Sequence, residues 1–110
     1  MVARPNRIPR HLFPTYFASG KRFHSTHFTI IATNTKDFKV STVVSKKVAK
    51  SAVDRNRLRR RAYGVMERQY QQEQLAGTYI ILYKPGALRS QRLVLQNELE
   101  TLLAQIKKAR

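Results

Sequence analysis

Apolar and β-branched residues gather into runs of strand length. Residues 28–33 and 38–45 are two such runs, and the polar residues 34–37 between them are typical of a turn. We therefore predict an antiparallel hairpin, with residues 21–24 as a short edge strand before it. Residues 78–83 form the most hydrophobic run of the chain, which favours a central position in the sheet.

A helical spacing of apolar residues replaces this pattern from about residue 51 to residue 72. Leu58, Ala62, Val65 and Met66 recur at intervals of three and four, so we predict that they form the buried stripe of a long helix. Gly64 costs this helix about 1 kcal/mol relative to alanine, which indicates either a close neighbour or a kink.

A shorter helix is predicted near the N-terminus. Its apolar stripe consists of Leu12, Phe13, Tyr16 and Phe17. Pro14 must lie in the first turn, because proline breaks a helix further in, and Gly20 follows the last turn. Residues 1–11 hold three arginines and little that could be buried, so we predict a basic, mobile N-terminal arm before this helix.

A last helix is predicted to begin at Ser90, a residue type suited to the N-cap position. Its apolar face would consist of Leu95, Leu99, Leu102, Leu103 and Ile106. The order of elements is then α-β-β-(β)-α-β-α. This order predicts an α+β fold, a single-domain sandwich in which helices pack on a small, mostly antiparallel sheet. Residues 12–110 would form this domain.

Charge changes this picture of an ordinary small domain. The chain has 110 residues with 22 Lys and Arg against 6 Asp and Glu, a formal net charge of +16 and a pI near 11.2. Residues 45–61 alone contain eight basic residues and one acidic residue. Like charges at this density repel one another unless an anion neutralises them, so the long helix is predicted to bind a phosphate-rich partner, with nucleic acid the leading candidate.

Residues suited to catalysis or metal binding are sparse. The six carboxylates are scattered, no HExxH-like spacing occurs, there is no cysteine, and the three histidines form no constellation. We therefore predict no catalytic residues and no metal ligands on the protein. The lack of cysteine, of a membrane-spanning run and of a secretion signal favours a soluble, cytoplasmic protein.

Two motifs of the basic segment resemble a known signature. The runs VSKKV at residues 44–48 and RNRLRR at residues 55–60 are similar to those of the protein subunit of bacterial ribonuclease P. Phe13, Phe17 and Gly20 resemble the family's first-helix pattern. Phe28 and residues 79–85 match a strand aromatic and the strand and proline before the family's last helix. The resemblance covers about residues 12–106, and it implies a ribonuclease P protein-like RNA-binding domain.

Four positions, at three places in the chain, depart from the family's pattern. Ala49 stands where glycine is common, Tyr63 and Gly64 replace an Arg-Glu pair, and Ile31 stands where tyrosine is frequent. These departures concern the geometry of a loop, the outer contacts of the long helix and one substrate contact.

The resemblance implies that the catalyst is an RNA subunit, which uses Mg²⁺ to remove the 5′ leader from precursor tRNA. The protein would be one subunit of this endoribonuclease, at one copy per RNA, and inactive alone. Residues implied to bind the RNA subunit are Lys46, Lys47, Lys50, Arg55, Asn56, Arg57, Arg59, Arg60 and Arg61. Arginine suits this task because its planar fork makes paired hydrogen bonds to phosphate.

The family also binds the single-stranded leader between its first helix and the sheet. Candidates here are Phe13, Tyr16, Phe17, Lys21, Arg22, Phe28 and Lys39. Stacking on aromatic rings tolerates any base, which suits a leader of variable sequence. The alternative for Phe13, Phe17 and Phe28 is burial in the core without contact to RNA.

Two other classes of protein share the basic composition. A structural RNA-binding protein, such as a ribosomal component, would need only charge and fold. A DNA-binding protein would need base-reading residues on a recognition helix, whereas this helix is filled with residues suited to phosphate. The combined spacing of the aromatic, Ser-Lys-Lys and Arg-Asn-Arg motifs favours the ribonuclease P protein over both.

Overall fold

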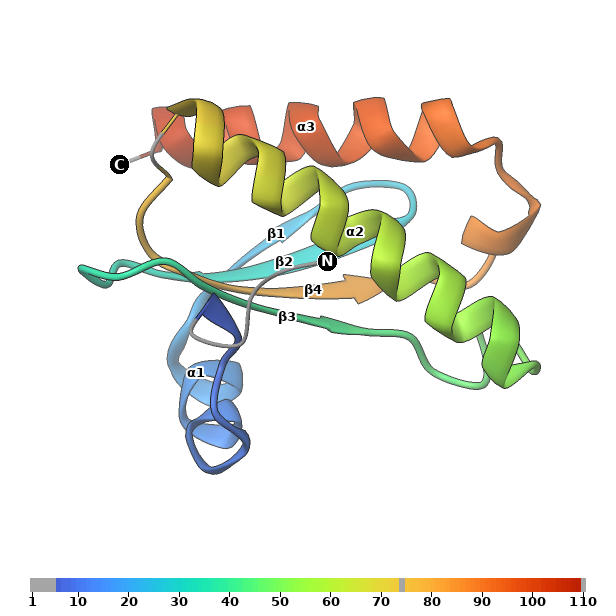
Figure 1. Ribbon diagram of the computed structural model, residues 1–110, viewed down its shortest axis with the longest axis horizontal. Coiled ribbons are helices and arrows are strands. Elements are labelled where there is room, and N and C mark those ends of the chain that lie inside the picture. The colour runs from blue at the N-terminus through green and yellow to red at the C-terminus, as the bar shows by residue number, and fades with distance from the viewer. Residues whose placement is uncertain (1–5, 74, 110) are drawn as a thin grey trace.

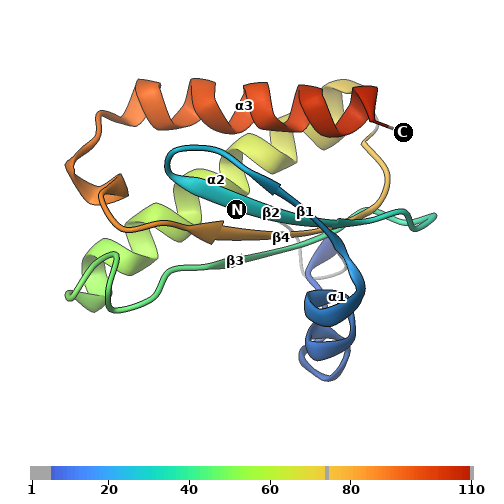
Figure 2. The same cartoon turned by 180° about the vertical axis from the view of Figure 1, so that it is seen from behind.

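The protein folds as a four-stranded sheet with two long helices on one face and a short helix on the other (Figures 1 and 2). The computed structural model describes residues 6–73 and 75–109. The helical elements are the 3-10 turn η2 (Arg10–Leu12), α1 (Phe13–Ser19), α2 (Ala52–Glu73), the 3-10 turn η3 (Ala87–Arg89) and α3 (Arg92–Lys108). The strands are β1 (Lys21–His24), β2 (Phe28–Thr33), β3 (Lys39–Val43) and β4 (Thr78–Tyr83). The predicted α+β class is confirmed.

The strand order is β1-β2-β4-β3, so the predicted hairpin between residues 28–33 and 38–45 is wrong. β2 pairs antiparallel with β1 and β4, whereas β3 pairs parallel with β4. Residues 34–38 cross the end of β4, where the hydroxyls of Thr35 and Thr78 hydrogen bond at 2.8 Å. The apolar β4 takes an inner position, as predicted, and α2 provides the long return that parallel strands need.

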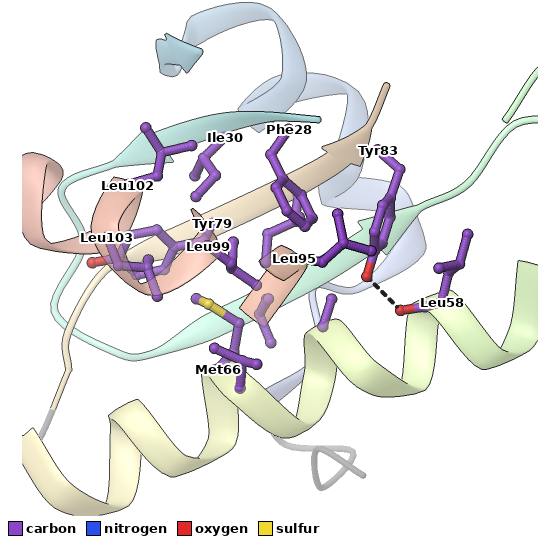
Figure 3. Close-up of a cluster of buried hydrophobic side chains, with 14 of the residues drawn as sticks. Phe28, Ile30, Leu58, Met66, Tyr79, Tyr83, Leu95, Leu99, Leu102 and Leu103 are labelled. Carbon is purple, nitrogen blue, oxygen red and sulfur yellow. Dashed lines mark hydrogen bonds between the residues drawn. The ribbon is translucent and has the colours of Figure 1, made fainter. Parts of the chain in front are cut away.

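The main core lies between the sheet and the two long helices (Figure 3). The predicted stripe of α2, Leu58, Ala62, Val65 and Met66, is buried there, and so is the predicted apolar face of α3, Leu95, Leu99, Leu102, Leu103 and Ile106. The hydroxyl of Tyr83 donates to the backbone carbonyl of Leu58 at 2.8 Å, which satisfies the polar end of a buried ring. Each fully buried leucine or methionine stabilises the fold by about 1.5–3 kcal/mol, so this core fixes α2 against the sheet.

Ser90 is not the N-cap of α3, which corrects the prediction. The N-cap is Gln91, without a side-chain capping bond, because the Ser90 hydroxyl hydrogen bonds instead to His27 Nε2 at 3.1 Å. His27 Nδ1 lies 2.7 Å from Glu98 Oε1, and Glu98 Oε2 accepts from the Ser25 hydroxyl at 2.5 Å and from the His27 backbone N–H at 2.6 Å. This network attaches the loop between β1 and β2 to α3.

A smaller apolar cluster lies on the opposite face of the sheet, beneath α1. Ile8, Ile31 and Ile80 are buried there, with Phe13 and Tyr16 of α1 packed against them. Gly20 ends α1, as predicted, and a β-carbon there would lie 2.4 Å from the Ile31 Cγ2 atom. Only glycine therefore lets the end of α1 approach β2 this closely.

Part of the predicted N-terminal arm is attached to the sheet. Residues 1–5 lie outside the described residues, but Arg7 bridges Val40 in parallel, and the Ile8 N–H donates to the Val40 carbonyl at 3.3 Å. β3 is an edge strand, so this contact extends the sheet by a short segment. In the part of the chain that the structure describes, no helix combines the length and the apolar character needed to cross a bilayer.

Candidate nucleic-acid interface

The loop before α2 presents lysines on a buried base. The N–H groups of Val48 and Ala49 donate to the Ser45 carbonyl at 3.1 and 3.2 Å, and both of these apolar side chains are buried. Lys46, Lys47 and Lys50 are consequently exposed. The loop is compact with Ala49 buried at its base.

Arg55 supports this loop from within α2. Its Nη1 atom donates to the carbonyls of Ala49 and Lys50 at 3.0 and 2.7 Å. Two charged hydrogen bonds to carbonyls occupy one end of the guanidinium group, so Arg55 positions the loop that carries the lysines. The resemblance implies an RNA contact for Arg55. The structure shows that Arg55 also supports the loop before α2.

The outer side of α2 carries the other predicted basic residues. Arg57 and Arg60 are exposed, and Arg57 Nη1 lies 3.5 Å from Asp54 Oδ1. Arg59 donates to the side-chain oxygen of Asn56, which orients its guanidinium group. Arg61 is half-buried and lies on the side of the helix that faces α3, beside Tyr83.

A hollow of about 450 Å³ is lined by Arg7, Asn56, Arg59, Arg60 and Tyr63. The Arg7 guanidinium carbon lies 5.3 Å from the centre of the Tyr63 ring, within the range of a cation–π interaction. The Tyr63 hydroxyl in turn accepts the Thr42 N–H of β3 at 3.2 Å. Sequence reasoning missed both Arg7 and Tyr63 as members of this surface, although Tyr63 follows Arg59 by one helical turn.

A second, larger hollow of about 680 Å³ lies between the lysine loop and η3. Lys46, Lys47 and Lys50 line one side, and Arg89 lines the other. Arg89 was not among the predicted site residues, because it lies far away in sequence. We use the name α2 surface for Arg7, Lys46, Lys47, Lys50, Asn56, Arg57, Arg59, Arg60, Tyr63 and Arg89.

The short helix forms a second candidate surface, which projects from the other side of the sheet (Figure 1). The Phe13 and Phe17 rings stack with centres 5.8 Å apart and planes at 27°, and Phe17 remains 37% exposed. Arg22 lies over the Phe17 ring, with its guanidinium carbon 4.9 Å from the ring centre, and its Nη2 donates to the Phe17 carbonyl at 3.3 Å. Tyr16 is half-buried beside them.

Strand register decides which other predicted residues join α1. Lys39 pairs with Thr78 and precedes Val40, whose side chain lies in the core beneath α2 and α3. Lys39 therefore faces the side of the sheet that α1 covers. We use the name α1 surface for Phe13, Tyr16, Phe17, Arg22 and Lys39.

Phe28 and Lys21 do not belong to the α1 surface, which corrects their predicted place beside Phe13 and Phe17. Phe28 is 1% exposed and packs in the main core, with its ring centre 4.7 Å from that of Tyr83. Lys21 alternates with Arg22 and lies over the Phe23 ring, near Ile106 of α3. Both residues point to the side of the sheet that α2 and α3 cover, because successive strand residues face opposite sides.

The acidic residues form no reactive centre that the structure shows. Asp54 pairs with Arg57, and Glu98 is bound by Ser25 and His27. Within residues 6–73 and 75–109, no group of three or more His, Cys, Asp or Glu side chains could hold a metal ion. The exposed cations of the α2 surface and the stacked rings of the α1 surface suit binding of an anionic polymer.

Comparison with known proteins assigns the family. A sequence profile of Ribonuclease P matches residues 5–107. The chain is 33% identical over 102 residues to the ribonuclease P protein component of Microcystis aeruginosa, covering 86% of this chain and 83% of that one. It is 32% identical over 96 residues to that of Nitratiruptor sp., covering 87% and 86%.

Solved structures agree in fold. The RNase P protein of Staphylococcus aureus matches with a TM-score of 0.77 at 25% identity, covering 93% of this chain and 95% of that one. The RNase P protein from Thermotoga maritima also gives a TM-score of 0.77, at 19% identity over 90% and 96% of the chains. With the profile covering nearly the whole sequence, the chain belongs to the family of bacterial ribonuclease P protein subunits.

Proposed function

We propose that this chain binds the catalytic RNA of ribonuclease P through the α2 surface and the 5′ leader of precursor tRNA through the α1 surface. By holding both, it promotes endonucleolytic removal of the leader, at one protein per RNA. The family assignment supports a role in this tRNA-processing complex, and the division of labour between the two surfaces is our inference.

The observation that carries the proposal is the density of cations on the α2 surface. Lys46, Lys47, Lys50, Arg57 and Arg60 are all exposed, and the protein's own hydrogen bonds hold the loop and Arg59 in place. A surface with this charge gains affinity for RNA by releasing the counterions that surround phosphates. Asn56 adds an amide that can bind a 2′-hydroxyl group.

The α1 surface suits a single strand for a different reason. The exposed Phe17 ring is available to a base, while Arg22 and Lys39 supply charge for the backbone. Stacking on an aromatic ring contributes about 1–3 kcal/mol per base and does not depend on its identity. A contact to the leader would favour precursor over mature tRNA, because the product lacks that strand.

Catalysis in this proposal belongs to the RNA. The described residues offer no cluster that fits Mg²⁺, so we assign the metal mainly to the RNA subunit and derive no step through it on the protein. The protein alone is proposed to be inactive, and a cytoplasmic location remains a prediction from the sequence.

The test is cleavage of a 5′-extended precursor tRNA at low Mg²⁺ by a bacterial ribonuclease P RNA, with and without this protein. Stimulation in the combined reaction, with no cleavage by the protein alone, is the expected result. Tight RNA binding without stimulation would favour the alternative, a structural RNA-binding protein. Cleavage by the protein alone would overturn the assignment of catalysis to RNA.

A further inference from the structure

Ser90, His27 and Glu98 form a hydrogen-bonded chain of side chains outside the α2 and α1 surfaces. The Ser90 hydroxyl lies 3.1 Å from His27 Nε2, and His27 Nδ1 lies 2.7 Å from Glu98 Oε1. Ser90 and Glu98 are 63 and 71 positions away from His27, and they meet it because the loop between β1 and β2 turns back beneath α3 (Figure 1). Spacing in the sequence therefore does not reveal this chain.

Donor and acceptor roles along the chain follow from Glu98. An ionised carboxylate only accepts hydrogen bonds, so His27 Nδ1 carries the proton that it shares with Glu98 Oε1. In a neutral imidazole Nε2 is then the acceptor, and the Ser90 hydroxyl donates to it. A hydroxyl that donates to an oriented imidazole is the arrangement that activates a serine as a nucleophile.

Glu98 is itself held in place. Its Oε2 atom accepts from the Ser25 hydroxyl at 2.5 Å and from the His27 backbone N–H at 2.6 Å. The side chains of His27 and Glu98 are only 19% and 16% exposed, which limits competition from water for their hydrogen bond. Glu98 therefore acts only through His27, as a positioning residue, and the Ser90 hydroxyl oxygen is the atom that could react.

The start of α3 lies next to Ser90, which precedes the first residue of the helix by two positions. The N–H groups in the first turn of a helix have no partner within the helix. The N-cap residue Gln91 makes no side-chain capping bond to them. These donors, at the positive end of the helix dipole, suit an oxyanion that forms beside Ser90.

Exposed apolar side chains flank Ser90 along the chain. Leu88 precedes it by two residues and is 41% exposed, and Leu93 and Val94, which follow it, are 67% and 50% exposed. Covering such side chains with another apolar group is favourable, because it removes apolar surface from water. The surroundings of Ser90 therefore favour a substrate with a short apolar chain.

We propose that Ser90 hydrolyses esters of short apolar acids, with His27 as its general base. Ser90 Oγ attacks the ester carbonyl carbon, and its proton passes to His27 Nε2. The bond to the leaving alcohol then breaks, the alcohol takes that proton, and Ser90 carries the acyl group. Water attacks the acyl carbon and gives one proton to His27, which returns it to Ser90 Oγ as the acid departs. This activity does not rest on the proposed function.

A fluorophosphonate with a short alkyl chain tests the first step on the full chain. Ser90 Oγ would form a bond to phosphorus, the bond from phosphorus to fluorine would break, and the serine proton would pass to His27 as fluoride leaves. Mass spectrometry of the intact protein and of its peptides counts and locates the label. We expect one label per chain, on Ser90. An unlabelled protein, or a label on another residue, would overturn the proposal.

His27→Gln should lower the rate of labelling at saturating probe by about a hundredfold, because glutamine cannot take up the proton. The probe concentration that gives half of this rate should not change. Ser90→Ala should abolish labelling. Ser51→Ala is its control, because Ser51 also lies beside the start of a long helix but hydrogen bonds to the Asp54 N–H. Equal rates in His27→Gln and the unmodified protein would contradict the proposal.

Glu98→Gln and Glu100→Gln remove the same charge from α3, and of these two residues only Glu98 bonds to His27 in the part of the chain that the structure describes. Glu98→Gln should lower the maximal labelling rate at least about tenfold, with an unchanged half-saturating concentration. Glu100→Gln should leave both quantities unchanged. If the two variants were equally slow, loss of charge and not the orientation of His27 would explain the effect.

Leu93→Ser tests the class of substrate at an exposed position, where the fold does not depend on the side chain. It should raise the half-saturating probe concentration about threefold at an unchanged maximal rate. Val53→Ser, equally exposed on α2, is the control. An unchanged half-saturating concentration for Leu93→Ser would exclude the apolar chain. Turnover is measured as nitrophenolate released from 4-nitrophenyl butyrate in excess of that released by Ser90→Ala, and no excess would exclude hydrolysis.

Discussion

The α2 and α1 surfaces lie on different sides of one sheet and are built in opposite ways. The α2 surface is dense in charge. Arg55 donates to the backbone of its lysine loop, Asn56 accepts from Arg59, and the Tyr63 hydroxyl accepts from the Thr42 N–H. The α1 surface has a stacked pair of rings with a single arginine over Phe17. Charge binds any phosphate backbone, whereas an exposed ring binds only unpaired bases. Under the proposed function, this difference would separate attachment to a folded RNA from selection of a single strand.

Charge reversal on the α2 surface should give the largest effect. We expect Arg57→Glu with Arg60→Glu to abolish assembly with the RNA subunit at near-physiological salt, a loss of more than about 3 kcal/mol. A gel-shift titration measures it. Lys36→Glu with Lys108→Glu, two exposed lysines outside both surfaces, changes net charge equally and serves as the control. If the two doubles behaved alike, total charge and not this surface would explain binding.

Gly20→Ala should disturb the α1 surface alone. The added β-carbon would lie 2.4 Å from Ile31 Cγ2 and 3.0 Å from Thr33 Oγ1, so the end of α1 must move or the chain loses about 1–3 kcal/mol of unfolding free energy. Urea denaturation measures the loss. Gly64→Ala is the matched control, because open space there predicts a small gain. A destabilisation by Gly64→Ala as large as that by Gly20→Ala would show that this account of both glycines is wrong.

Phe17→Ala should weaken precursor binding by about tenfold, the loss of one stacking contact, and leave assembly with the RNA subunit unchanged. Affinity for precursor tRNA with a leader, compared with mature tRNA, is the quantity to measure in the assembled complex. Phe17→Tyr keeps the ring and should retain the preference. An equal loss of affinity for both tRNAs would mean that Phe17 does not contact the leader.

Glu98→Gln should have the smallest effect and spare both surfaces. Burial raises the pKa of Glu98, but hydrogen bonds from Ser25 and His27 outweigh this effect and hold the pKa below its ordinary value. A lowered folded-state pKa stabilises the protein above the unfolded value, and this contribution is lost as pH falls through the folded pKa.

The unfolding free energy of the unmodified protein should therefore fall more steeply below about pH 5 than that of Glu98→Gln. Urea denaturation at several pH values measures the slopes. Identical slopes would show that Glu98 does not contribute to acid sensitivity. Altered RNA binding at pH 7 would show that the hydrogen-bond network of Ser25, His27 and Glu98 is coupled to the α2 or the α1 surface.

Local patterns predicted most elements of this fold. The helices of residues 12–19 and 51–72 followed from apolar spacing, Pro14 and Gly20, all of which act within a few residues. Strand pairing was predicted wrongly, because the choice between β2 and β4 as the neighbour of β3 depends on the crossing of α2 and not on the intervening turn. Ser90 was misassigned because His27, 63 residues away, competes for its hydroxyl.

The candidate site was predictable to the same degree. The basic residues of α2 could be named from sequence, since charge on an exposed helix face needs no tertiary information. The sequence groups Phe28 with Phe17 because the alternation of residues along a strand shows which of them share a face of the sheet. It does not show which face α1 covers. Arg7, Tyr63 and Arg89 join the α2 surface only through the tertiary fold.

The short bridge between Arg7 and Val40 has a consequence for colloidal behaviour. An edge strand leaves backbone donors and acceptors free to pair with another molecule and so to seed aggregates. Here the Ile8 N–H donates to the Val40 carbonyl, and the Thr42 N–H donates to the Tyr63 hydroxyl, so both edge groups are paired. Removing the first eight residues would uncover this edge in a protein whose high charge otherwise keeps its copies apart.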